Sequence, residues 1–289
     1  MTPAEVTVAE RLQLRIADLT PAERKVARVL LAQYPVRGLE PIAKLAAQAG
    51  VSAPTVVRLV SKLGFDSYHG FQQSLKSEVA VRLSSPLSMH PERSGVQGGA
   101  LERAERVLCD GITSSFARLP RPEFDQAVRL LAEPKRNVTL IGGRFSSMLA
   151  DYLAAHLHIL RHGVRVISSS GADRVSSMLD VGRRDVLVAF DYRRYQHDTV
   201  RLAVTARQQG ATLIAFTDPY LSPLASHADV ILTTSVASPS PFDALTPALA
   251  LVETLVAALV DKLGSAPLAR MARYDALFAG TIETTGEDE

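Results

Sequence analysis

The stretch Leu45–Gly64 reads LAAQAGVSAPTVVRLVSKLG. Its apolar spacing predicts a helix that ends near Gln48 and, after a tight turn, a second helix of about three turns. Gly50 suits that turn because glycine adopts the left-handed conformation without strain. Ser52 is expected to cap the second helix, and Pro54 lies in its first turn, where a missing N–H costs nothing. Together these signals predict a helix-turn-helix, whose second helix can enter the major groove of DNA.

The second helix carries an apolar set and a polar set. We expect the first to pack inward: Val56, Val57, Val60 and Leu63. We expect the second to face outward and to meet DNA: Ser52, Ala53, Thr55, Arg58, Ser61 and Lys62. Ala53 and Thr55 suit thymine methyls and base edges, Arg58 suits a guanine or a phosphate, and Lys62 suits a phosphate. Helix–glycine–helix corners also occur in bundles that never meet DNA, so a plain helical bundle stays an alternative.

Helical periodicity extends on both sides of this motif without any alternating strand pattern. The predicted helices are Ala22–Tyr34, Pro41–Gln48, Pro54–Leu63 and Tyr68–Leu83. Residues 1–83 are therefore expected to form an all-helical DNA-binding domain. Residues 84–100, SSPLSMHPERSGVQGGA, lose the periodicity and concentrate Pro, Gly and Ser, as is typical of a linker.

Beyond the linker, two helices at about 101–119 and 122–132 precede a different pattern. Five short apolar runs alternate there with helical stretches: Val138–Ile141, Val164–Ile167, Val186–Phe190, Thr212–Phe216 and Val230–Leu232. Strands separated by helices indicate parallel βαβ units, so residues 101–280 are predicted to form an α/β doubly wound, mainly parallel five-stranded sheet. Ligands bind such sheets at the carboxyl ends of the strands. Residues 281–289 are expected to be a frayed tail.

Charge is divided unevenly along the 289 residues, although the net charge is only +2. Residues 1–83 carry 11 Lys and Arg against 7 Asp and Glu, and the remainder carries 21 against 23. This division predicts a basic DNA reader joined to a slightly acidic domain. The single cysteine, Cys109, excludes an internal disulfide and a cysteine-based zinc cluster. With no signal peptide or membrane span evident, we expect a cytoplasmic protein without a metal or a cofactor.

The segments LTPAERKVARVLLAQYP and IAKLAAQAGVSAPTVVRLVSKLGFDSYHGFQQSL carry a resemblance. They are similar to the N-terminal domain of RpiR/MurR-type bacterial transcription regulators over about residues 10–80. The similarity is specific, because the cap, the proline, the arginine and the KLGF-x-x-Y-x-x-F ending occur together. It implies that a sugar-isomerase-type (SIS) domain follows and senses a small metabolite, commonly a phosphosugar. The βαβ pattern agrees with that implication independently.

The turn after the first predicted strand is the first candidate effector site. Gly142 and Gly143 let the backbone approach a ligand, and the following helix offers free N–H groups and a positive dipole end to an anion. Ser146 and Ser147 can add hydroxyl donors. An ordinary βα turn capped by serine is the alternative. The resemblance to SIS domains implies a Gly-x-Gly-x-Ser loop here, in which Arg144 replaces the second glycine.

The second candidate loop, Phe190–Gln196, departs further from the family pattern. Where SIS domains usually carry Ser-x-Ser-Gly, this chain places Asp191 and Arg193. Arginine grips a carboxylate or a phosphate bidentately, so an anionic effector is predicted, with Asp191 orienting the arginines or binding a hydroxyl or an amine. Alternatively, Asp191 pairs structurally with Arg193 or Arg194. The expected effector-binding set is Gly142, Gly143, Arg144, Ser146, Ser147, Asp191, Arg193, Arg194, Gln196 and Thr217.

These features predict a transcriptional regulator and not an enzyme. We expect a homodimer or homotetramer that presents paired helix-turn-helix units to double-stranded operator DNA, with the effector altering their placement. Repression is the default that the resemblance implies. One alternative is a sugar-phosphate isomerase with an appended helical domain and Glu253 as its base, although the phosphate-holding serines are replaced. The other is a non-catalytic interaction module.

Overall fold

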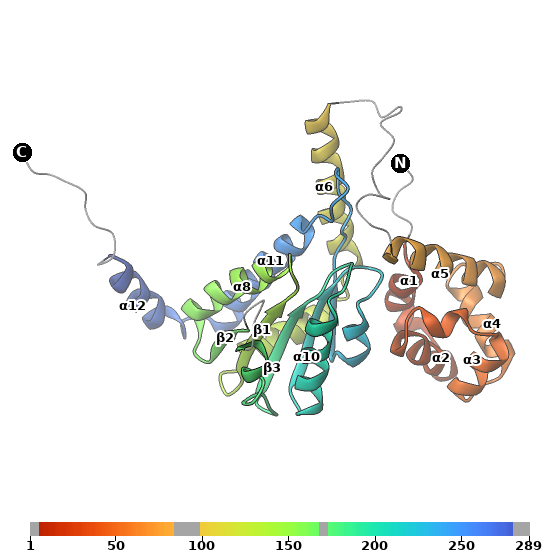
Figure 1. Ribbon diagram of the computed structural model, residues 1–289, viewed down its shortest axis with the longest axis horizontal. Coiled ribbons are helices and arrows are strands. Elements are labelled where there is room, and N and C mark those ends of the chain that lie inside the picture. The colour runs from red at the N-terminus through yellow and green to blue at the C-terminus, as the bar shows by residue number, and fades with distance from the viewer. Residues whose placement is uncertain (1–5, 84–98, 168–172, 280–289) are drawn as a thin grey trace, which may run out of the picture.

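The computed structural model of this chain describes residues 6–83, 99–167 and 173–279 (Figure 1). The predicted linker, apart from Gly99 and Ala100, lies outside the described residues, as does the predicted tail, 281–289. Ala100, which the composition places in the linker, is the first residue of a helix.

The first described segment is all helical, as the sequence predicts. Its helices are α1 (Val8–Arg15), α2 (Pro21–Ala32), α3 (Ile42–Ala49), α4 (Ala53–Lys62) and α5 (Tyr68–Leu83), with 3₁₀ turns at Ile16–Asp18 and Val36–Leu39. Capping boxes begin α1 and α2: Thr7 and Glu10 exchange side-chain and backbone hydrogen bonds, and so do Thr20 and Glu23. We refer to these five helices as the helical unit.

The second part of the chain contains five parallel strands in the order β2-β1-β3-β4-β5. They are β1 (Asn137–Gly142), β2 (Val164–Val166), β3 (Asp185–Phe190), β4 (Thr212–Thr217) and β5 (Val230–Thr233). The helices are α6 (Ala100–Arg118), α7 (Arg121–Ala132), α8 (Ser147–Leu160), α9 (Asp173–Ser176), α10 (His197–Gln208), α11 (Thr246–Leu263) and α12 (Leu268–Ala279), with a 3₁₀ turn at Pro223–His227. The predicted doubly wound parallel sheet is confirmed.

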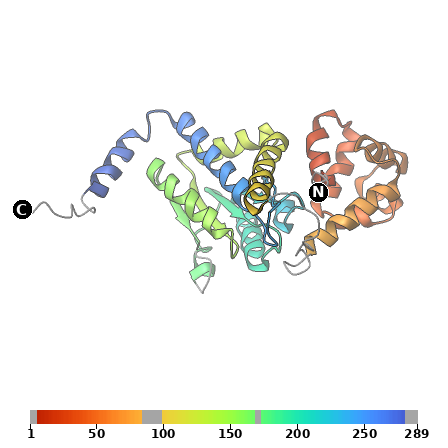
Figure 2. The same cartoon turned by 90° about the horizontal axis from the view of Figure 1, so that it is seen from above.

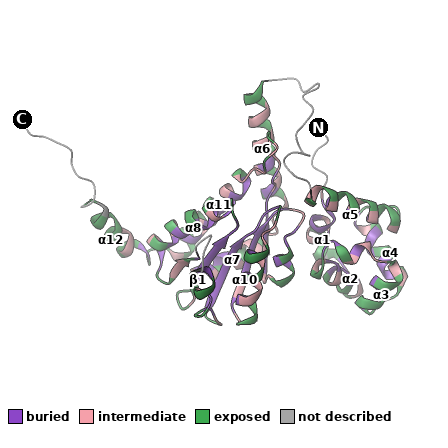
Figure 3. Ribbon diagram, in the orientation of Figure 1, coloured by how far each residue is buried: buried purple, intermediate pink, exposed green. Residues whose placement is uncertain are grey.

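Both faces of the sheet are covered, which explains why its central strands β1, β3 and β4 are mainly apolar. Helices α7, α8 and α11 pack on one face, where alternate residues such as Val186 and Val188 contribute to the core. Helix α10 and the 3₁₀ turn pack on the other face, against Leu187 and Ala189. The buried strands stand out in the middle of this domain (Figure 3). The carboxyl ends of β1 and β3 are thus held rigidly side by side.

The helical unit rests against the end of the sheet domain that carries the β4–β5 connection. Leu221 and Ala225 of that connection join the apolar core of the helical unit. The Thr7 hydroxyl donates to the carbonyl of Pro219 at 3.0 Å, and Arg118 of α6 pairs with Glu10 at 3.2 Å. The helical unit and α12 lie at opposite ends of the molecule (Figure 2).

Across the described parts of the chain, every helix is too short or too polar to cross a membrane.

Candidate DNA-binding helix and effector pocket

The turn between α3 and α4 has the geometry that the sequence predicts. Gly50 is left-handed, with φ 61°, and its N–H donates to the carbonyls of Ala46 and Ala47. Ser52 takes the extended conformation of an N-cap residue, but its side chain does not cap the helix. Its hydroxyl instead hydrogen-bonds the hydroxyl of Thr55 at 3.1 Å. The expected side-chain cap is therefore wrong, although the helix begins where predicted.

The outward face of α4 differs from the prediction at two positions. Ser52, Arg58 and Ser61 are exposed, and Ala53 and Lys62 are half-buried. Thr55 is only 5% exposed, and its hydroxyl hydrogen-bonds the side chains of Ser52 and Arg58. Val57 is 49% exposed and does not pack inward as expected. The free surface of this helix therefore centres on Val57 and Arg58.

Lys62 already has an ionic partner. Its ammonium group lies 2.8 Å from a carboxylate oxygen of Glu23, whose side chain is 3% exposed. Burial would raise the pKa of Glu23, but the hydrogen bonds from Lys62 and Thr20 outweigh burial and hold this pKa below its usual value. Because Glu23 already neutralises part of its charge, Lys62 should attract a phosphate less strongly than the sequence suggests.

The loop between β1 and α8 needs glycine at Gly142. A Cβ there would lie 2.4 Å from the Cα of Ser147, closer than any real contact. The hydroxyl of Ser146 accepts from the N–H of Gly143 at 3.0 Å and donates to the carbonyl of Phe190 at 2.7 Å, so it holds the loop instead of facing a ligand. Within the described residues, the N–H groups of Arg144 and Phe145 have no protein acceptor. They remain available to an anion.

A cavity of about 520 Å³ opens at the carboxyl ends of β1 and β3. Its lining includes seven residues predicted from the sequence: Gly143, Arg144, Ser146, Asp191, Arg193, Arg194 and Gln196. The other predicted residues, Gly142, Ser147 and Thr217, are not part of the lining. Thr217 is fully buried, and its hydroxyl accepts from the N–H of Ser222 at 3.0 Å. Its expected role at the pocket surface is therefore wrong.

Six further lining residues were not predicted: Phe145, Met148, Tyr192, Phe242, Asp243 and Leu245. The last three follow the small-residue segment Ser235–Pro241, which precedes the last long helix of the sheet. That position was the available signal, because a loop that leaves β5 begins at the carboxyl edge of the sheet, where the cavity lies.

Asp191 does not pair with either neighbouring arginine. It is 1% exposed, accepts the N–H of Gln196 at 3.1 Å and accepts the hydroxyl hydrogen of Ser222. Burial raises the pKa of Asp191 to about 6, and the Ser222 hydrogen bond opposes that rise. Both expected pairings, orienting the arginines and binding them structurally, are therefore wrong. Asp191 instead holds the loop that leads into α10.

Asp243, and not Asp191, is the carboxylate that pairs with the two arginines. Its carboxylate forms ion pairs with Arg193 and, at 3.5 Å, with Arg194. The side chain of Arg193 is 3% exposed, and its other terminal nitrogen donates to the carbonyl of Val81 in α5 at 3.3 Å. Arg144 lies over the ring of Phe145, 5.4 Å from its centroid. The pocket thus contains two arginines, Arg193 and Arg194, that are paired with a carboxylate, and one, Arg144, that has no ion pair among the described residues.

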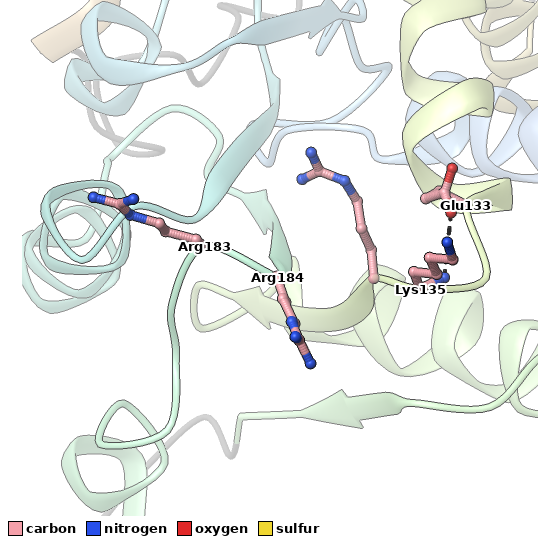
Figure 4. A pocket seen from close by; sticks show the side chains of 5 residues that line it. Glu133, Lys135, Arg183 and Arg184 are labelled. Carbon is pink, nitrogen blue, oxygen red and sulfur yellow. Dashed lines mark hydrogen bonds between the residues drawn. The ribbon is translucent and has the colours of Figure 1, made fainter.

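A second cavity, of about 700 Å³, lies at the amino ends of β1 and β3. It is lined by Glu133, Lys135, Arg136, Arg183 and Arg184. The side chains of Arg183 and Arg184 point in different directions and do not converge on one point (Figure 4). The cavity at the carboxyl ends is the better candidate, because doubly wound sheets bind ligands there.

Glu253, the conceivable base of an isomerase, lies outside the pocket lining. It is exposed on α11 and accepts a hydrogen bond from the hydroxyl of Tyr152 at 3.2 Å. An exposed carboxylate away from the cavity is not positioned to move a proton next to a bound carbonyl.

Two known domain families match successive parts of this chain. Residues 6–84 match the helix-turn-helix domain of the rpiR family, and residues 130–258 match the SIS domain. Among solved structures, the Vibrio vulnificus NanR protein complexed with ManNAc-6P is 18% identical, with a TM-score of 0.55. That likeness covers 96% of this chain and 99% of NanR, and it shows a shared fold.

Two curated relatives extend the comparison. The bifunctional protein glk of Burkholderia mallei is 29% identical over 80% of this chain, and the chain spans 35% of the length of that relative. The HTH-type transcriptional regulator HexR of Pseudomonas aeruginosa is 30% identical over 217 residues, which make up 72% of each protein. The chain therefore belongs to the rpiR family of helix-turn-helix transcriptional regulators that carry a SIS domain.

Proposed function

We propose that the protein is a cytoplasmic repressor whose SIS domain senses a small anionic metabolite, a sugar phosphate or a carboxylate, and thereby alters operator binding. The observation that carries the DNA-binding part is the exposed guanidinium of Arg58 on α4. Among the described residues its recorded partner is the neutral hydroxyl of Thr55, at 3.1 Å. Its positive charge is therefore free for a base edge or a phosphate.

The effector part rests on the cavity at the carboxyl ends of β1 and β3. Arg144 and Phe145 line this cavity, and their N–H groups have no acceptor among the described residues, so the guanidinium of Arg144 and these two N–H groups are available to a small anion. The structural neighbour NanR is complexed with ManNAc-6P, which supports a sugar phosphate as the effector class.

A homodimer or homotetramer fits this function. One helix-turn-helix unit makes few base contacts, and two linked units on a pseudo-palindromic operator combine their binding free energies, which multiplies the weak affinity of each unit. An effector that favours one relative placement of the units shifts operator affinity by about 1–3 kcal/mol.

The test is a selection of duplex DNA from a randomised library with the full chain, followed by binding measurements with variants. Arg58→Ala should weaken binding to the selected duplex by about 1–3 kcal/mol and relax the preference at one position. Arg129→Ala is the matched control, because Arg129 is also exposed and lies on α7 outside the helical unit. Failure to enrich any sequence, or an equal loss in both variants, contradicts the proposal.

A further inference from the structure

The cavity at the carboxyl ends of β1 and β3 already contains a negatively charged group of the protein itself, the carboxylate of Asp243. Asp243 lies between β5 and α11, and its two carboxylate oxygens reach separate guanidinium groups, those of Arg193 and Arg194. The side chain of Asp243 is 10% exposed and that of Arg193 is 3% exposed. Asp243 also lines the same cavity as Arg144. The carboxylate thus occupies the place where two arginines converge.

The side chains that line the cavity carry more positive than negative charges. Arg193, Arg194 and Arg144 supply three positive charges, whereas Asp191 and Asp243 supply the two carboxylates. Asp191 is engaged with the loop backbone and with Ser222, so among the described residues the ion pair of the buried Arg193 is formed with Asp243. A second anion that joined Asp243 on this arginine would be repelled by it. An anion from solution that binds to Arg193 and Arg194 must therefore replace the carboxylate of Asp243.

Replacement favours an anion with more charge than the group that leaves. A monocarboxylate carries one negative charge, as Asp243 does, and gains no Coulomb attraction by the exchange. A phosphate monoester carries about 1.5 to 2 negative charges at neutral pH and three acceptor oxygens. It can bridge the two guanidinium groups and still accept from Arg144.

We propose that Asp243 is the specificity-determining residue of the effector site: an internal competitor that excludes monocarboxylates and admits phosphate monoesters. This inference rests on the proposed function and narrows its effector class. The bound phosphate group takes the place of the Asp243 carboxylate on Arg193 and Arg194. The Arg193 side chain also contacts the carbonyl of Val81, so the exchange occurs on a residue that touches the helical unit.

The test compares inorganic phosphate with acetate as probes at constant ionic strength, using the thermal stabilisation of the full chain to obtain apparent affinities. Asp243→Asn keeps the size of the side chain and removes the competing charge. It should bind phosphate at least tenfold more tightly than the unchanged protein, and acetate binding should become measurable. Asp261→Asn, an exposed position on α11, removes the same charge away from the pocket and should change neither affinity.

A second variant tests the site without disturbing the buried pair. Arg194 is exposed and has φ 69°, a conformation that Asn tolerates, so Arg194→Asn should fold and should weaken phosphate binding at least fivefold. Unchanged or weaker phosphate binding by Asp243→Asn overturns the inference, and so does unchanged binding by Arg194→Asn. If Asp243→Asn behaves as expected but the protein selects no DNA, the proposed function fails and the role of Asp243 stands.

Discussion

The guanidinium of Arg82 lies over the ring of Tyr195, 4.6 Å from its centroid, and this contact joins the last turn of α5 to the loop after β3. Arg82 also donates to the carbonyl of Tyr34 inside the helical unit at 3.3 Å. On the other side, the hydroxyl of Tyr195 donates to buried Asp218 at 2.9 Å. A continuous series of contacts thus connects the helical unit with the carboxyl ends of the strands.

Arg82→Ala should loosen this connection. A partly desolvated cation–π contact is worth about 0.5–2 kcal/mol, so its loss should let the loop after β3 open more often. Native-state hydrogen exchange should show the amides of Gln196 and Tyr220 exchanging severalfold faster, since Gln196 donates to Asp191 in this loop and Tyr220 donates to Asp218, the partner of Tyr195. Lys76→Ala, at an exposed site on α5, is the control. Equal exchange in both variants would show that the contact carries no coupling.

Glu23→Gln should release Lys62 for DNA. Gln keeps an acceptor for the N–H of Thr20, so α2 retains its cap, while the ammonium group of Lys62 loses its counter-ion. Each additional phosphate contact steepens the dependence of log affinity on log salt by about 1. Fluorescence anisotropy with one duplex at several salt concentrations measures this slope. Glu105→Gln, exposed on α6, should leave it unchanged. A slope that does not change in Glu23→Gln means that Lys62 does not reach the DNA backbone.

Periodicity predicted the fold well because burial follows it directly. The central strands β1, β3 and β4 are buried by helices on both faces, so each contains a mainly apolar run such as Val186–Phe190. Helix α1 was missed although it has the same signal as α2, a capping box, here from Thr7 to Glu10. Helix α12 was also missed, because it follows α11, the last helix that packs on the sheet, and the alternation of strands and helices gives no reason to expect a further helix.

The pocket was predicted less completely because its ionic pairing depends on tertiary structure. Arg193 and Asp243 are 50 residues apart in the chain, and no local pattern links them. Asp191, two residues from Arg193, was the nearer partner in sequence, but strand β3 directs it toward Ser222. Ser146 was expected at the ligand because serine is a common donor there, whereas its hydroxyl closes the loop onto Phe190.

Gly142→Ala should destabilise the sheet domain by about 1–3 kcal/mol, the usual cost of overpacking. The added Cβ meets the backbone of Ser147, which cannot rotate away as a side chain can. Urea unfolding measures the change in the free energy of unfolding. Gly182→Ala is the matched control, because its Cβ meets nothing within 4 Å and should be neutral or slightly stabilising. Similar stability in the two variants would mean that the loop after β1 shifts to accept a side chain.

Asp218→Asn should change how stability depends on pH. Burial raises the pKa of Asp218 to about 6, while the Tyr195 hydrogen bond opposes the rise. The unfolded chain has an Asp pKa of about 3.9, so the contribution of this group is full below that pH and is lost as the pH rises through about 6. Asn cannot ionise, and it keeps the oxygen that accepts from Tyr195 and from the N–H of Tyr220. The variant should therefore escape this loss.

The quantity to measure is the free energy of unfolding of Asp218→Asn minus that of the unchanged protein, from urea titrations at several pH values. Between about pH 5 and pH 7 it should rise in favour of the variant, by on the order of 1 kcal/mol. The substitution also removes the repulsion by which Asp218 helps to raise the pKa of Asp191, an effect of the same sign. For Asp261→Asn the corresponding difference should stay constant. A constant difference for Asp218→Asn as well would mean that Asp218 stays ionised across this range, with a cation or water reaching the oxygen that has no recorded protein partner among the described residues.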